Sequence, residues 1–251
     1  MIVAAAFCPQ PPLLHPTLLG SDGQEMGAAL RVACADALSR VQTLQPDAVL
    51  VLGRADAPSG AAADPVEATG YGQSEVAEFG PGDAGDLIGY GGSVRVGFHG
   101  PPTPDAARLP LAHTLGAWLL DEAGFAGHRV GVVAGRRSPH LESAGPDGRR
   151  WALLVMGDGS ARRTEKSPGW YDPAAVAFDD GVIAALTSGD GSALLDLDLA
   201  VGDRVLAAGL PSWRAAGAIL ENTPMTARLH YADAPFGVMY VVASWVGTDT
   251  R

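Results

Sequence analysis

The strongest constraint on the fold is the segment from residue 151 to 170, where an apolar run gives way to glycine and then to charge. The run WALLVM, residues 151–156, carries no charge and is followed at once by GDGS, residues 157–160. A short apolar run that glycine ends is typical of a buried strand of a parallel sheet. In open α/β sheets, ligands bind at the loops that follow such strands. The sequence therefore predicts a candidate binding loop directly after residue 156.

Strand and helix patterns alternate along the rest of the chain. Residues 2–7 form a short apolar run, as does the segment 47–52 after its first residue, Asp47, and apolar residues recur at helical spacing over 27–44 between them. This order predicts a right-handed βαβ unit whose two strands pair in parallel. We also expect strands at 93–98 and 129–134, helices at 109–123, 173–187 and 192–217, the last broken near 209–211, and a closing pair of strands at 227–231 and 238–245. The predicted fold class is α/β: a single domain over residues 1–251 with a central mixed, largely parallel sheet, flanking helices and a C-terminal β-hairpin.

A long loop and a histidine within a helix stand out from this alternation. Residues 53–92 lose periodicity and are rich in Gly, Ala, Pro and acids, which predicts a long irregular loop. His113 lies among apolar neighbours within the expected helix 109–123, a setting typical of a hydrogen-bonded core histidine.

Composition excludes several classes of partner. The 251 residues carry a formal net charge of -11, which argues against nucleic acid or an anionic membrane as a partner. No apolar run approaches the roughly 20 residues that span a bilayer, and the start MIVAAAF does not resemble a secretory signal. Cys8 and Cys34 imply no disulfide framework, so we expect a cytoplasmic protein.

Polar residues that follow the expected strands form the candidate site. The proline-rich residues 8–12 make a stiff loop after the first strand, and Arg54 and Asp56 follow the second. The candidate ligand-binding residues are Gln10, His15, Arg54, Asp56, Asp158, Ser160, Arg162, Arg163 and Lys166. Arginine and lysine at such an edge favour a small carboxylate or phosphate.

Alternatives to this site stay open at the level of sequence. His15 is equally well explained as an incidental histidine of a surface turn, and the basic side chains can pair with Asp158 and Glu165 instead of a ligand. Ser160 is disfavoured as a nucleophile because GDGSA departs from the G-x-S-x-G elbow.

Several motifs together resemble one family. They are CPQPPLLHP at 8–16, GDGSARRTEK at 157–166, PSW at 211–213 and YADAPFGVMYVVASW at 231–245. In this order, and over nearly the whole chain, they resemble the class III extradiol ring-cleavage dioxygenase subunit-B-like proteins of actinobacteria. The resemblance implies a single α/β domain and, in active relatives, cleavage of catechol-type rings by O₂ at a ferrous iron. Two His and one Glu hold that iron, and a further His moves a proton.

The family's functional positions are replaced in this sequence. Gln10 stands at the first metal histidine, residues 53–56 (GRAD) offer no second one, and residues 157–163 lack the acid/base histidine. The nearest glutamate to the family's ligand is Glu221, which lies too late to match. We therefore assign no metal-binding residue, and expect ferrous iron as a cofactor only if a non-standard set exists, such as His15 and Asp56 with His99 or His230.

Three classes of function follow from these observations. The first is an oxygenase that acts on a catechol-type aromatic substrate through an unrecognised metal set. The second is a metal-free protein that binds a small anionic or aromatic molecule, either as a sensor or as an enzyme of another reaction. The third is a non-catalytic subunit of a homo-oligomer.

Overall fold

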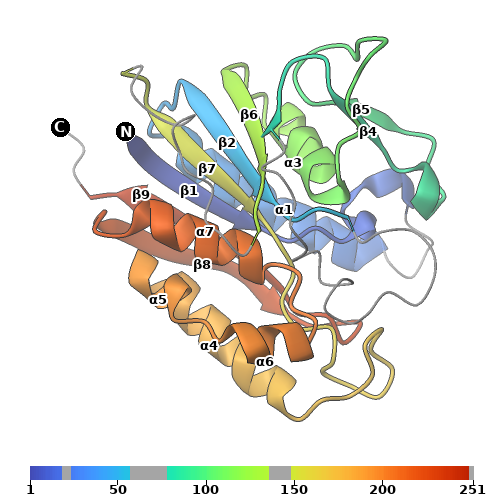
Figure 1. Cartoon of the computed structure of the whole chain (residues 1–251), viewed down its shortest axis with the longest axis vertical. Coiled ribbons are helices and arrows are strands. Elements are labelled where there is room, and N and C mark those ends of the chain that lie inside the picture. The colour runs from blue at the N-terminus through green and yellow to red at the C-terminus, as the bar shows by residue number, and fades with distance from the viewer. Residues whose placement is uncertain (19–23, 57–77, 136–147, 249–251) are drawn as a thin grey trace.

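A seven-stranded mixed sheet forms the centre of the computed structural model, which describes residues 1–18, 24–56, 78–135 and 148–248 (Figure 1). The strand order is β3-β6-β2-β7-β1-β9-β8. Strands β6, β2, β7 and β1 run parallel to their neighbours in this order, whereas β3, β9 and β8 pair antiparallel. The strands are β1 (Ile2–Cys8), β2 (Ala48–Gly53), β3 (Glu78–Phe79), β6 (His128–Val133), β7 (Trp151–Met156), β8 (Met225–Asp233) and β9 (Tyr240–Gly247). The predicted α/β class, with a mixed, largely parallel sheet and a C-terminal hairpin of β8 and β9, is confirmed.

Helices cover both faces of the sheet, which gives three layers (Figure 1). One face packs against α1 (Gln24–Gln42) and α3 (Leu111–Glu122). The other packs against α4 (Ala174–Ser188), α5 (Gly191–Leu195), α6 (Leu199–Arg204) and α7 (Leu210–Leu220). Strand β7 supplies both cores, because Leu154 faces the first and Leu153 the second. Burying such a side chain contributes about 1.5–3 kcal/mol relative to leaving it in water, which explains the uninterrupted apolar run.

The predicted pairing of the first two strands is wrong. β1 and β2 are parallel to each other, but β7 lies between them and pairs with both, since Leu153 is opposite Ala5 on one side and Leu50 on the other. Local patterns determine that a segment is a strand, but not which strand becomes its neighbour. The central position goes to β7, all six of whose residues are buried.

The second half of the expected irregular loop at 53–92 is ordered into short elements. After residues 57–77, which lie outside the described part of the chain, come β3, β4 (Ala84–Asp86) and the 3-10 helix η4 (Ile88–Tyr90). β4 pairs antiparallel with β5 (Arg95–Gly97) in a small second sheet. Side-chain hydrogen bonds hold this region, because the two carboxylate oxygens of Asp83 accept the N–H groups of Gly80 and Ala107, each at 2.9 Å. Such bonds leave no periodic pattern in the sequence.

The remaining segments agree with the predicted elements or refine them. The expected helix 192–217 is three helices, α5, α6 and α7, and the predicted break near residue 209 is present. A further interruption falls before α6, where the Asp198 side chain accepts the N–H of Val201 at 3.0 Å. Short 3-10 helices η1 (Pro12–Leu14) and η2 (Pro16–Leu18) follow β1. Residues 136–147, between β6 and β7, lie outside the described part of the chain.

His113 is the core histidine that the sequence predicts. Its side chain is fully buried in α3, and its Nε2 lies 3.0 Å from the carbonyl oxygen of Val132. Burial lowers the pKa of His113 to about 4, although the hydrogen bond to Val132 opposes this shift. The ring is therefore neutral at physiological pH, as a hydrophobic core requires. Within the described residues, no helix has the length and apolar character needed to cross a membrane.

Candidate functional site

An open pocket of about 820 Å³ lies where β1 and β2 end and α3 begins. Its polar lining comprises Gln10, Arg54, Asp56, Asp86, Tyr90 and Arg108, and residues 109–111 supply an apolar wall. These groups come from four separate stretches of chain that the sheet edge brings together. The pocket occupies the edge at which ligands bind in open α/β sheets.

The loop after β1 links this pocket to the loop after β7. The backbone N–H of Gln10 donates to Oδ1 of Asp158 at 2.8 Å, and the N–H of Gly157 donates to the carbonyl of Cys8 at 2.9 Å. Pro11 holds an extended conformation with φ -70° and ψ 141°. The proline-rich loop thus places Gln10, whose side chain is only 8 % exposed, beside Asp158.

Asp158 carries the most unusual carboxyl group of the site. Burial raises the pKa of Asp158 from its ordinary value of 3.8 to about 7, against the opposing effects of the Gln10 N–H and the nearby charge of Arg54. In turn, burial and the charge of Asp158 raise the pKa of the Tyr240 hydroxyl. A carboxyl group that titrates near neutral pH, at the edge of a pocket, is suited to moving a proton.

Asp158→Asn is expected to change how stability depends on pH. Between about pH 4 and pH 7 the folded protein keeps a proton on Asp158, whereas the unfolded chain has already released it. The contribution of Asp158 to the free energy of unfolding is therefore complete below this window and is lost as the pH rises through it. The loss is at most about 1.4 kcal/mol per pH unit. Asparagine keeps an oxygen for the Gln10 N–H without the charge. Urea denaturation at pH 5 to 8 should show a variant that is more stable than the native protein at pH 8, with a gap that narrows toward pH 5. Parallel curves for the two proteins would contradict the assignment.

The two acids that line the pocket are already engaged by backbone groups. Oδ1 of Asp56 accepts the N–H of Leu111 at 2.9 Å, at the first turn of α3. Oδ1 of Asp86 accepts the N–H of Ile88 at 3.0 Å, and lies 3.9 Å from the Arg108 guanidinium. A backbone hydrogen bond stabilises a carboxylate without cancelling its charge, and the Arg108 guanidinium lies within ion-pair distance of Asp86. The lining therefore combines two acids with two guanidinium groups, those of Arg54 and Arg108.

Sequence reasoning missed Tyr90 and Arg108. Tyr90 lies at the end of η4. Burial raises the pKa of its hydroxyl, and the negative charge of Asp56 raises it further. Arg108 reaches the site because residues 107–109 bond to Ala84, with the N–H of Leu109 donating to the Ala84 carbonyl at 3.0 Å. One signal was available for Tyr90, which is a lone aromatic residue between Gly89 and Gly91.

His15 is buried away from this pocket, so it is not an exposed histidine of a surface turn. Its ring centroid lies 5.0 Å from that of Trp118 in α3, and its Nδ1 lies 2.8 Å from the Thr17 hydroxyl. Burial lowers the pKa of His15, with the charge of Glu122 opposing the shift. His15 therefore packs between η1 and α3, and it does not line the pocket with Gln10.

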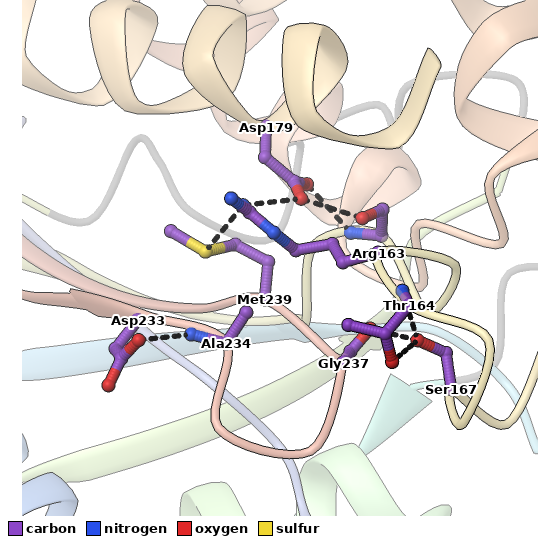
Figure 2. Close-up of polar contacts among 9 residues, drawn as sticks. Arg163, Thr164, Ser167, Asp179, Asp233, Ala234, Gly237 and Met239 are labelled. Atoms are coloured by element: carbon purple, nitrogen blue, oxygen red, sulfur yellow. Dashed lines mark hydrogen bonds and ion pairs between the residues drawn. The ribbon is translucent and has the colours of Figure 1, made fainter. Parts of the chain in front are cut away.

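In the loop after β7, two predicted site residues bind a buried aspartate of α4. The Ser160 hydroxyl donates to Oδ2 of Asp179 at 2.6 Å, and the Ser160 N–H donates to Oδ1 at 2.8 Å. The Arg163 guanidinium lies 3.1 Å from Oδ2 of Asp179 and 3.4 Å from the Met239 sulfur (Figure 2). Burial raises the pKa of Asp179, opposed by these hydrogen bonds. Ser160 and Arg163 thus hold the loop against α4 and against Met239, which directly precedes β9.

The end of the same loop is tied to the β8–β9 hairpin. The Ser167 hydroxyl donates to the Gly237 carbonyl at 3.1 Å and accepts the Thr164 N–H at 2.8 Å (Figure 2). Arg162 is partly buried and its carbonyl accepts the Asp172 N–H, whereas Lys166 is exposed. The structure therefore brings Gln10, Arg54, Asp56 and Asp158 together, and places Ser160, Arg162, Arg163 and Lys166 elsewhere.

The residues of the pocket do not fit a ferrous ion. Gln10 offers a neutral amide and Arg54 a positive charge, neither of which suits Fe²⁺. Within the described residues, no group of three His, Cys, Asp or Glu side chains could hold a metal. Of the non-standard set, Asp56 lines the pocket, whereas His15 packs against Trp118 and His230 lies 2.8 Å from the Ser244 hydroxyl on β9.

Comparison with known proteins supports the fold. No family model matches the sequence, and no curated protein matches it either. Among solved structures, the fold is similar to that of the uncharacterized protein JW3007 from Escherichia coli K12, with a TM-score of 0.50 and 12% sequence identity. The match covers 98% of this chain and 100% of that one. At this identity the likeness shows a shared fold and nothing more about function.

Proposed function

We propose that this protein is a relative of the class III extradiol dioxygenases that binds a small anionic, aromatic molecule without ferrous iron. One observation carries the proposal: two guanidinium groups, those of Arg54 and of Arg108, which lies 3.9 Å from Asp86, line the same pocket as the apolar residues 109–111. Guanidinium groups bind carboxylates through paired N–H donors, and they do so best where solvent is partly excluded.

The shape and apolar wall of the pocket support an aromatic ligand. A volume of about 820 Å³ is large enough for a substituted ring. Leu109, Pro110 and Leu111 contribute apolar surface to the lining, and Tyr90 contributes a ring. We infer a carboxylate held at the arginines with a ring against residues 109–111.

Iron content tests the metal-free part of the proposal. Protein purified without an affinity tag and treated anaerobically with ferrous iron should retain well under one iron per chain after desalting. Near one iron per chain, lost on replacing His15 or Asp56, would overturn the proposal. Ring cleavage of catechols would then become the leading function.

Arg54→Gln is expected to weaken binding of benzoate by about tenfold or more, because a hydrogen bond to a charged group contributes about 1.5–3 kcal/mol. Isothermal titration calorimetry measures the change. Lys166→Gln is the matched control, since it removes one positive charge from an exposed position outside the pocket. Equal losses in the two variants would indicate a general effect of charge and would contradict a specific role for Arg54.

We further propose a cytoplasmic location and a small molecule as the partner, rather than nucleic acid or membrane. Cys8 and Cys34 are both buried and free, as suits a reducing compartment. The net charge of -11 disfavours anionic polymers and surfaces. Assembly into a homo-oligomer stays a prediction, which sedimentation would test.

A further inference from the structure

The Gln10 side chain contains a polar atom that the fold leaves without a partner. Its carboxamide oxygen Oε1 is shut off from solvent and has no hydrogen bond, although Gln10 lines the pocket. Buried polar atoms are nearly always paired, because an unpaired one forfeits its bonds to water without replacement. The exceptions in folded proteins call for a specific explanation.

The fold itself gives no reason for a glutamine at this position. The contact that joins the loop to β7 uses the backbone N–H of Gln10, which donates to Asp158, and any residue except proline supplies that group. Pro9, Pro11 and Pro12 set the course of the loop. An apolar side chain of similar size would fill the same space without an unpaired oxygen. The carboxamide is therefore better explained by something that enters the pocket.

We propose that Gln10 is a specificity-determining residue whose carboxamide turns about its last side-chain bond, which brings Oε1 to the pocket, and accepts a hydrogen bond from the ligand. The ligand class is then a small carboxylic acid that also carries an O–H or N–H donor, with the carboxylate at the arginines and the donor at Gln10. This inference rests on the proposed function, namely that Arg54 and Arg108 bind a carboxylate in this pocket. It adds a requirement that charge alone does not impose.

Matched ligands separate the two ideas. Calorimetric titration would compare benzoate with 3- and 4-hydroxybenzoate, and each of these with the methoxybenzoate of the same substitution, which keeps the oxygen but cannot donate. We expect at least one hydroxybenzoate to bind about tenfold more tightly than benzoate and its methoxy analogue, the gain of satisfying a buried acceptor. Binding of all ligands with equal affinity would overturn the role of Gln10 and leave the proposed function standing. No binding by any of them would overturn the proposed function itself.

Variants of Gln10 then assign the preference to this side chain. Gln10→Met keeps the length of the side chain, and Gln10→Leu fills a similar volume with apolar atoms. Both variants keep the backbone N–H that donates to Asp158. We expect both variants to lose the preference for the donor, so that a hydroxybenzoate binds no more tightly than its methoxy analogue. A preference that survives in a folded variant would place the acceptor elsewhere. Equal weakening of every ligand would mean that Gln10 only shapes the loop, and either result overturns the inference.

Discussion

Asp179→Ala is expected to lower the free energy of unfolding by about 3–5 kcal/mol, the usual cost of removing one partner of a buried charged pair. The carboxylate is fully buried and receives three hydrogen bonds, two from Ser160 and one from Arg163. Alanine would leave the buried Ser160 groups without partners and the Arg163 guanidinium, 23% exposed, without its counter-charge. The loop after β7 would lose its attachment to α4.

Urea denaturation measures this effect, and the neighbouring residue provides the control. Asp180 is exposed on the same helix, so Asp180→Ala should change stability by no more than about 0.5 kcal/mol. Asp179→Asn should fall between the native protein and the alanine variant, since an amide keeps one acceptor for Ser160. A loss below about 1 kcal/mol for Asp179→Ala would show that the network contributes little to stability.

Gly157→Ala is expected to cost about 3 kcal/mol, at the upper end of what overpacking usually costs. A methyl group built on Gly157 would lie 2.2 Å from Cα of Gly209, in the backbone just before α7. Backbone on both sides cannot turn away as a flexible side chain can, so the end of β7 and the start of α7 must move apart. That movement would strain the hydrogen bond at 2.7 Å from the Gly209 N–H to the Asp158 carbonyl.

Gly181→Ala is the matched control for this substitution. Gly181 is exposed within α4, and an added methyl group meets no atom within 4 Å. Because alanine is the better helix former, this variant should be more stable than the native protein by roughly 0.5–1 kcal/mol. Thermal denaturation of the two variants should therefore shift in opposite directions. A Gly157→Ala protein of native stability would contradict the close backbone contact.

The strands could be predicted because a strand that is buried on both faces has an uninterrupted run of apolar residues. The runs at 151–156, 2–7 and 47–52 are the observed β7, β1 and β2 within a residue at each end. Their order in the sheet could not be predicted, because parallel neighbours are selected by packing of whole layers. The same holds for β4 and β5, whose position depends on single side chains such as Asp83.

The candidate site was predictable only where it follows strands. Gln10, Arg54, Asp56 and Asp158 come directly after β1, β2 and β7, and the carboxyl ends of parallel strands meet at one edge. Tyr90 and Arg108 reach the pocket through the small β4–β5 unit, which follows a segment without periodicity. Their approach depends on long-range contacts that no local pattern reveals.

The charged loop after β7 was misleading because charge in a sequence does not show its partner. Arg163 has its partner in Asp179, some distance along the chain. A signal was present in α4, where Asp179 shares a helical face with Ala175, Val182 and Leu186, all buried. An acid on an apolar face indicates a buried pair, and its cation had to come from another segment.

The central position of β7 also determines when the chain can fold during synthesis. β1 and β2 are both made early, yet each has β7 as a neighbour, so their facing edges stay unpaired until residue 156 has left the ribosome. Strand β9, which completes the other edge of β1, arrives about 90 residues later. Folding of the sheet is thus governed by contacts between residues far apart in sequence, which makes it slow. Over that interval the nascent β1 and β2 are exposed to wrong pairing, and assistance from a chaperone would matter most then.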